Sequence, residues 1–218
     1  MVDIVLLWMR LSLDFSDAMS SIAFSKFLDS QDLAIMLRKT AQDVRLRPIK
    51  WDVKQKYYHA SLTASVAGWD NYVKSVVREF YRSLSNPLDQ RYAFAHSLAG
   101  DMSEKVLSRL NTPDRDQARN AILLCTGYDP INDWTWRKAQ MSATDVKEFL
   151  ADIFRVRHSY AHGFALPSTA WTRTPTGKVQ LSSISLARVE AFLRHLAKRT
   201  DNGLRGHAKT VTQGLIVW

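Results

Sequence analysis

Two histidines and two arginines stand close together in the sequence, between Arg155 and His162. A helix turns by about 100° per residue, so His158 and His162, four positions apart, are predicted to lie on one face, one turn apart. Histidine both gives and takes a proton near neutral pH, and arginine holds phosphate oxygens through parallel hydrogen bonds. Gly163 follows directly and favours the end of a helix at this point. This stretch is therefore the strongest candidate for chemistry.

These residue types suit the cleavage of RNA by its own 2′-hydroxyl group. That reaction takes a proton from the 2′-hydroxyl, gives a proton to the leaving 5′-oxygen and stabilises charge on a phosphorane-like transition state. Histidine and arginine supply these roles without a metal ion. The same residues have a structural interpretation, in which the histidines cap helix carbonyls or bind metal adventitiously and the arginines are solvated.

Other motif classes are absent from the sequence. It contains neither of the glycine-rich patterns that cradle phosphates, and no HExxH or GxSxG pattern. The single cysteine, Cys125, excludes an intrachain disulfide and a cysteine-ligated zinc site, and its apolar neighbours favour a place in the core. We therefore expect no cofactor and no metal site.

Charge is distributed unevenly along the 218 residues. Residues 151–218 carry ten basic and three acidic side chains, and this segment supplies most of the net charge of +9. Nucleic acid is the commonest partner of so basic a segment, and a helix face kept soluble by lysine and arginine is the alternative. No apolar run approaches the ~20 residues of a membrane span, so we expect a cytoplasmic protein that does not contact the membrane.

Helices must position the candidate residues. Apolar residues recur at steps of three and four over Lys54–Arg82 and again over Ser183–Thr200, where Asn202-Gly203 is expected to end the helix. The helix that carries the two histidines is predicted to begin with a capping box at Ser142. The sequence thus predicts a single all-α domain over residues 1–218, built as a bundle of five to seven helices.

The remaining segments complete this bundle. One or two helices are predicted over Asp17–Val44, and their expected inward residues are Ile22, Phe27, Leu33 and Leu37. Asn86-Pro87 and Thr112-Pro113 are typical of helix starts. Phe164–Gln180 is polar and interrupted by proline and glycine, so it is predicted to be a loop.

Tryptophans with basic neighbours in the expected loops are candidates for binding RNA. Trp134 and Trp136 precede a basic pair, and Trp171 stands two positions before Arg173. Aromatic rings stack on unpaired bases while cations contact the phosphates. The alternative is that these rings pack the loops onto the core.

The stretch from Arg157 to Gly163, Arg-His-Ser-Tyr-Ala-His-Gly, resembles the RX4–6H motif of HEPN domains. More narrowly, it resembles the R-H-x-x-A-H-G variant of the RiboL-PSP-type branch. Ala60–Glu79 and Leu110–Trp136 are also similar to that branch, so the likeness covers residues 50–200. The resemblance implies a HEPN-like helical bundle that forms a homodimer and brings two motifs together across a cleft. It also implies metal-independent endoribonuclease activity in a toxin–antitoxin, phage-defence or RNA-processing role.

The resemblance also implies roles for single residues. His162 would be the general acid and base, Arg157 would stabilise the scissile phosphate, and His158 would orient that phosphate or share the proton transfer. Arg155 fits the spacing too, but Arg157 is preferred because polar His158 follows it. The residues expected to bind the substrate are Arg155, Ser159, Tyr160, Trp171 and Arg173.

Three functions stay open at this point. The first is a homodimeric ribonuclease for single-stranded or looped RNA. The second is a non-catalytic RNA-binding module regulated by a partner such as an antitoxin. The third is a helical interaction protein whose histidines only cap a helix. The first two predict an RNA affinity that falls steeply with salt, and the third predicts no such binding.

Overall fold

The computed structural model describes residues 20–43, 45, 49–84, 90–110 and 115–212. Within these ranges the chain forms six α-helices and no named strand. The helices are α2 (Ile22–Thr40), α3 (Trp51–Ser83), α4 (Gln90–Ser108), α5 (Arg115–Thr126), α6 (Ala143–Ala161) and α7 (Ser183–Val211), with the short 3-10 helices η2 (Pro130–Asn132) and η3 (Arg137–Ala139) between α5 and α6. The prediction of an all-α bundle of five to seven helices is confirmed.

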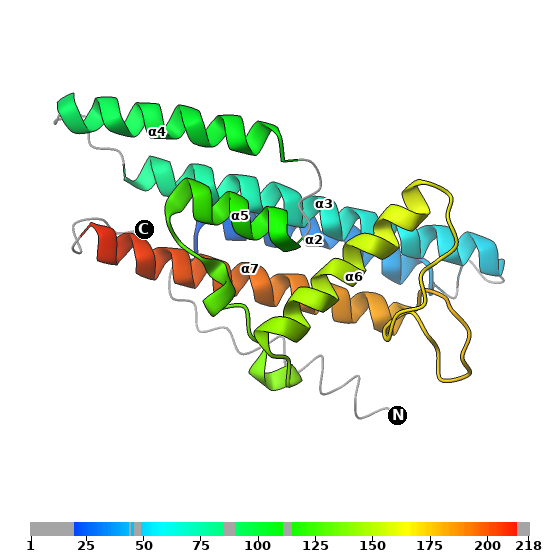
Figure 1. Cartoon of the computed structure of the whole chain (residues 1–218). Helices are drawn as coiled ribbons and strands as arrows, with labels where there is room; N and C mark the ends of the chain where they lie inside the picture. The colour runs from blue at the N-terminus through cyan, green and yellow to red at the C-terminus, as the bar shows by residue number, and fades with distance from the viewer. Residues whose placement is uncertain (1–19, 44, 46–48, 85–89, 111–114, 213–218) are drawn as a thin grey trace.

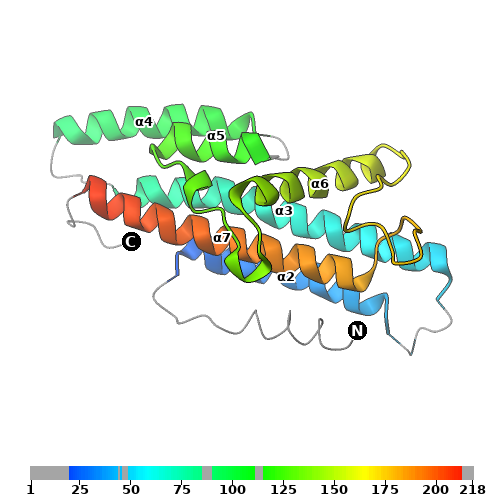
Figure 2. The same cartoon turned by 60° about the horizontal axis from the view of Figure 1, so that its bottom comes forward.

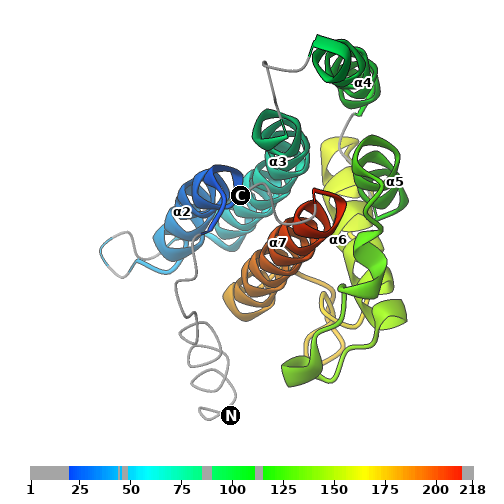
Figure 3. The same ribbon diagram turned by 90° about the vertical axis from the view of Figure 1, so that its left-hand side faces the viewer.

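The long helices α3 and α7 form the centre of the bundle (Figure 1). α2 packs against both of them on one side, and the end-on view shows α5 and α6 on the other side (Figure 3). α4 is the outermost helix and contacts α3 and α5 (Figure 2). No helix in the described part of the chain is long and apolar enough to cross a bilayer.

The apolar stripe of α3 is the axis of the core. Its predicted members are all buried, namely Tyr58, Leu62, Val66, Trp69, Val73, Val76 and Phe80. The ring of Trp69 lies beside those of Tyr72 and Trp134, with centroid distances of 5.8 and 6.1 Å. The Tyr72 hydroxyl donates a hydrogen bond to the carbonyl of Ala197 on α7 at 2.7 Å. This contact ties α3 to α7 inside the core, as burial of a tyrosine hydroxyl requires.

α2 turns only part of its predicted apolar face inward. Phe27 is buried as expected, but Ile22 and Leu33 are 58% and 52% exposed, so the prediction for these two residues is wrong. Small side chains let α2 lie close to α3: the Ser61 hydroxyl donates to the carbonyl of Ala34 at 2.8 Å. The orientation of α2 is therefore set by its close approach to α3 together with the burial of Phe27, and this orientation leaves Ile22 and Leu33 in water.

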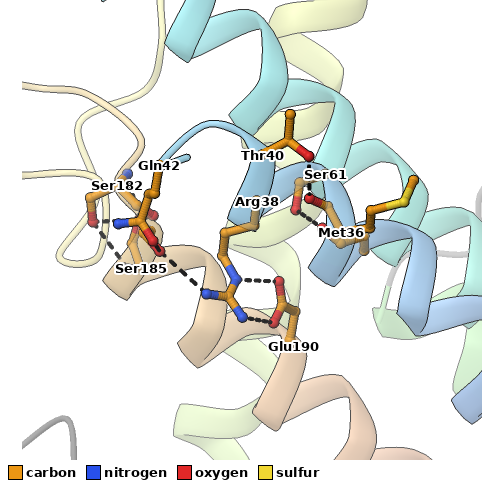
Figure 4. Close-up of polar contacts among 10 residues, drawn as sticks. Met36, Arg38, Thr40, Gln42, Ser61, Ser182, Ser185 and Glu190 are labelled. Carbon is orange, nitrogen blue, oxygen red and sulfur yellow. Dashed lines mark hydrogen bonds and ion pairs between the residues drawn. The ribbon is translucent and has the colours of Figure 1, made fainter. Parts of the chain in front are cut away.

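A buried ion pair joins the end of α2 to the start of α7 (Figure 4). Arg38 Nε and Nη2 donate to the two carboxylate oxygens of Glu190 at 2.7 and 2.8 Å. The side chains are only 14% and 7% exposed. The Ser183 hydroxyl accepts a further hydrogen bond from Arg38 at 3.3 Å and donates to Gln42 at 3.0 Å. This two-bond pairing fixes α2 against α7.

α7 does not end at Asn202-Gly203, as the sequence predicts, but continues to Val211. Gly203 has a different purpose. A Cβ atom at this position would overlap the Tyr128 hydroxyl and come within 2.5 Å of Asp133 Oδ2. The glycine therefore makes room for the Tyr128–Asp133 hydrogen bond of 2.5 Å against the helix surface.

Replacing Gly203 by alanine is expected to lower the free energy of unfolding by about 1–3 kcal/mol, because the methyl group must displace the Tyr128 side chain. Urea denaturation measures this loss. Gly206→Ala is the matched control, since a Cβ there meets nothing within 4 Å. That variant is expected to be neutral or slightly stabilising. Equal stability of the two variants would contradict the packing role of Gly203.

The predicted helix starts at Asn86-Pro87 and Thr112-Pro113 lie outside the described residues, and the helices that follow begin at Gln90 and Arg115. The loop predicted over Phe164–Gln180 is confirmed, since this segment contains no helix.

Candidate active site at the end of α6

α6 is bounded by two local signals that the sequence predicts. At its start, the Ser142 hydroxyl accepts the N–H of Asp145 at 3.2 Å, and the Asp145 carboxylate accepts the N–H of Ser142 at 2.8 Å. At its end, Gly163 has a φ of +70°, which glycine adopts without strain. The capping box and the left-handed cap are both confirmed.

The end of α6 forms a Schellman motif. The N–H of Gly163 donates to the carbonyl of Tyr160 at 3.2 Å, and the N–H of Phe164 donates to the carbonyl of Ser159 at 2.7 Å. His162 is the C-cap residue, and the chain leaves the helix directly after it. The backbone that carries the candidate residues is therefore held by defined hydrogen bonds.

The two histidine rings lie together at this helix end. The centroids of His158 and His162 are 4.2 Å apart, and the angle between their planes is 46°. Both side chains are exposed. The Phe164 ring lies 5.9 Å from His162 and 6.4 Å from His158. The structure thus places the two histidines on one face, as their spacing predicts, and adds an aromatic ring that sequence reasoning missed.

The two arginines differ in their surroundings. Arg155 is exposed, and its Nη1 lies 3.1 Å from Asp152 Oδ1, one turn earlier on α6. Arg157 is half-buried and has no carboxylate partner among the described residues. Its guanidinium group is therefore the one whose charge is not already matched by a neighbouring carboxylate.

Ser159 and Trp171 do not face the histidine rings. Ser159 is 5% exposed, and its hydroxyl donates to the carbonyl of Val156 within α6. Trp171 is 6% exposed and packs edge-to-face on Phe149, with ring centroids 6.1 Å apart. The protein covers both side chains in this structure, so neither is open to a substrate as the sequence led us to expect.

The other loop tryptophans also belong to the core. Trp134 is fully buried, and its indole N–H donates to the Thr200 hydroxyl at 2.9 Å. Trp136 stacks on His195 with ring centroids 5.0 Å apart. Burial of such large apolar rings stabilises the folded state, so these tryptophans hold the loops onto the bundle.

The loop after α6 folds toward the start of α3 (Figure 1). The indole N–H of Trp51 donates to Gln180 Oε1 at 3.3 Å, and Lys178 Nζ lies 4.7 Å from the centre of the Trp51 ring. Arg173 is exposed and donates two hydrogen bonds to the hydroxyl of Ser168. Exposed cations of this loop therefore lie at the same end of the bundle as the two histidines.

Tyr160 connects the end of α6 to α3. Its ring stacks on that of His59 with centroids 3.8 Å apart and an angle of 5° between the planes. Tyr160 remains 44% exposed. Burial lowers the pKa of His59 from 6.5 to about 4, and its Nδ1 has no hydrogen-bond partner among the described residues. His59 is therefore neutral at pH 7, and it fixes the last turn of α6 in place.

The free energy of unfolding is expected to fall as the pH is lowered from about 6.5 to about 4. The unfolded chain binds a proton at His59 more readily than the folded one, so the contribution of neutral His59 is complete above about pH 6.5 and is lost toward pH 4. His59→Phe keeps a stacking ring but cannot titrate. Urea denaturation at pH 7 and pH 4.5 should show a smaller loss of stability for this variant than for the wild type. Equal losses would remove His59 from the pH response.

No model of a protein family, no curated protein and no solved structure matches this chain. No group of three or more histidine, cysteine, aspartate or glutamate side chains is placed to hold a metal ion within the described ranges. The arrangement at the end of α6 is the observation on which the proposed function rests. Phe164 and His59 are its members that sequence reasoning missed. The sequence did contain a signal for Phe164, because an apolar residue directly after a glycine cap usually packs back on the helix.

Proposed function

We propose that the protein is a metal-independent endoribonuclease of the HEPN type, whose active site contains Arg157, His158 and His162. The supporting observation is the exposed pair of imidazole rings, 4.2 Å apart, on the same helix end as an arginine without a carboxylate partner among the described residues. RNA cleavage by the 2′-hydroxyl needs two groups that transfer protons and one group that holds the phosphate.

In the proposed reaction, one imidazole accepts the proton of the 2′-hydroxyl while that oxygen forms a bond to phosphorus. The other ring, as imidazolium, donates a proton to the 5′-oxygen while the bond from phosphorus to that oxygen breaks. His162 is assigned as general acid and base, and His158 shares the proton transfer. Arg157 binds the non-bridging oxygens and stabilises their charge. The products carry a 2′,3′-cyclic phosphate and a 5′-hydroxyl.

The proposed active form is a homodimer in the cytoplasm, in which the helix ends of two copies face each other. An antitoxin or another partner protein would then regulate access to this site. Sedimentation analysis of the purified protein tests the dimer.

Cleavage of labelled tRNA and mRNA in EDTA tests the activity. We expect cleavage without added metal and products with 2′,3′-cyclic phosphate ends. An RNA that carries a single 2′-deoxynucleotide at a mapped cleavage site is the control, and it should stay intact there because the nucleophile is missing. A requirement for Mg²⁺, or products with 5′-phosphate ends, would reject the proposal.

A non-catalytic RNA-binding module is the second candidate. The observation that favours it is the exposed cations near the end of α6, among them Arg155, Arg173 and Lys178. Such a module would bind RNA with an affinity that falls steeply with salt and would leave the RNA intact.

A further inference from the structure

We infer that Phe164 is a base-stacking residue, and that the site takes RNA with an unpaired base next to the reacting phosphate. The inference rests on the proposed function, since it names the substrate class of the same site. It is carried by the position of the Phe164 ring beside the two histidines and by its exposure.

The Schellman motif determines where the Phe164 ring lies. Phe164 is the second residue after the C-cap, and an apolar residue there usually packs on the helix side chain five or six positions earlier. In this chain those positions are Ser159, which is buried, and His158. The ring therefore lies against imidazoles instead of an apolar side chain. It is stacked on His162 at an interplanar angle of 27°.

Phe164 keeps most of its ring in water. It is 65% exposed, next to the groups proposed to transfer protons. A base that stacks on this ring removes apolar surface from water, and stacking of one base on an aromatic side chain contributes about 1–3 kcal/mol. The bases of an A-form duplex are covered by their neighbours, so only an unpaired base fits this contact.

The other exposed aromatic rings near this helix end already have partners. One face of Tyr160 is covered by His59 at 3.8 Å, and Lys178 lies over the ring of Trp51. Phe164 contacts only His158 and His162 among the described ring contacts. Phe164 also has the largest exposed fraction of these three residues, at 65% against 55% for Trp51 and 44% for Tyr160.

Binding of an RNA that resists cleavage tests the inference apart from catalysis. We would use a single-stranded 12-nucleotide RNA with 2′-O-methyl groups throughout and move one 2-aminopurine along it. The wild type should quench the fluorescence at one position, because that base stacks on Phe164. Phe164→Ala should lose this quenching and bind about 5- to 150-fold more weakly, whereas Phe164→Trp should retain both. An abasic nucleotide at the quenched position should weaken binding of the wild type and leave Phe164→Ala unaffected.

Phe94→Ala is the matched control, since it removes an exposed phenylalanine from α4. α4 contacts the far end of α3 through His96 and Tyr81, about 30 Å along that helix from His59. Phe94→Ala should bind like the wild type. Equal binding and quenching by wild type and Phe164→Ala would overturn the inference even if the RNA-cleavage assay succeeds, and would favour a protein as the partner of this ring. Retained stacking without cleavage of natural RNA would support the inference and overturn the proposed ribonuclease instead.

Discussion

Alanine at His162 or at Arg157 is expected to lower the rate of RNA cleavage by about 10²–10⁴-fold while the protein stays folded. His162 is exposed at the C-cap of α6, and Arg157 is half-buried without a carboxylate partner among the described residues, so neither substitution breaks an ion pair. The loss therefore reports on proton transfer and phosphate binding. Initial rates in EDTA at saturating RNA, with thermal unfolding of each variant, measure it.

Arg155→Ala is the matched control for Arg157→Ala. It removes the same cation two residues earlier, but one that already pairs with Asp152 at 3.1 Å. We expect at most a small loss of RNA affinity, of the size that an exposed charge contributes at low salt. Equal rates for wild type, His162→Ala and Arg157→Ala would sink the assignment of the site. A large loss for Arg155→Ala with a small one for Arg157→Ala would exchange the roles of the two arginines.

Glu190→Ala should destabilise the protein by about 3–5 kcal/mol, because it leaves the guanidinium of Arg38 buried without its carboxylate. Both side chains are nearly covered, and two hydrogen bonds of 2.7 and 2.8 Å connect them (Figure 4). The loss of stability arises more from the buried, unpaired charge of Arg38 than from the loss of its hydrogen bonds to Glu190. Urea denaturation at neutral pH gives the free energy of unfolding.

A double variant separates these two causes. Arg38→Met together with Glu190→Leu removes both charges and keeps apolar volume, so it should recover most of the stability lost in Glu190→Ala. If Glu190→Ala unfolds at the same urea concentration as the wild type, the pair does not hold α2 against α7. If the double variant is as unstable as Glu190→Ala, the pair itself stabilises the fold rather than merely avoiding an unpaired charge.

Signals that act within one or two helical turns were readable from the sequence. The apolar stripe of α3 follows from residues three and four positions apart. Such a stripe must be buried whichever elements the helix packs against. The capping box at Ser142, the left-handed Gly163 and the side-by-side placement of His158 and His162 involve groups at most six positions apart. The all-α class and the centre of the candidate site were therefore predictable.

The predictions were wrong where contacts between distant segments of the chain decide the local structure. Asn202-Gly203 is typical of a helix end, but contact with Tyr128 and Asp133 makes glycine the residue that allows α7 to continue. Ile22 and Leu33 are apolar enough to face inward, yet α2 is turned by its close approach to α3. Local preference is worth tenths of a kcal/mol per residue, and such contacts outweigh it.

The surface of the site also depends on tertiary contacts. Trp171 stands near a basic residue in a loop, which is typical of an aromatic that binds RNA, but Phe149 packs against it and it is buried. Phe164 stays exposed. His59, about 100 residues before Tyr160, has no local signal at all, and only the packing of α3 on α6 brings the two rings together. By itself, the sequence determined the apolar stripe of α3, both caps of α6 and the pair of histidines, because these depend on neighbours along the chain. The tertiary structure decided which rings and charges remain open to a ligand, since burial depends on what the rest of the chain places over them.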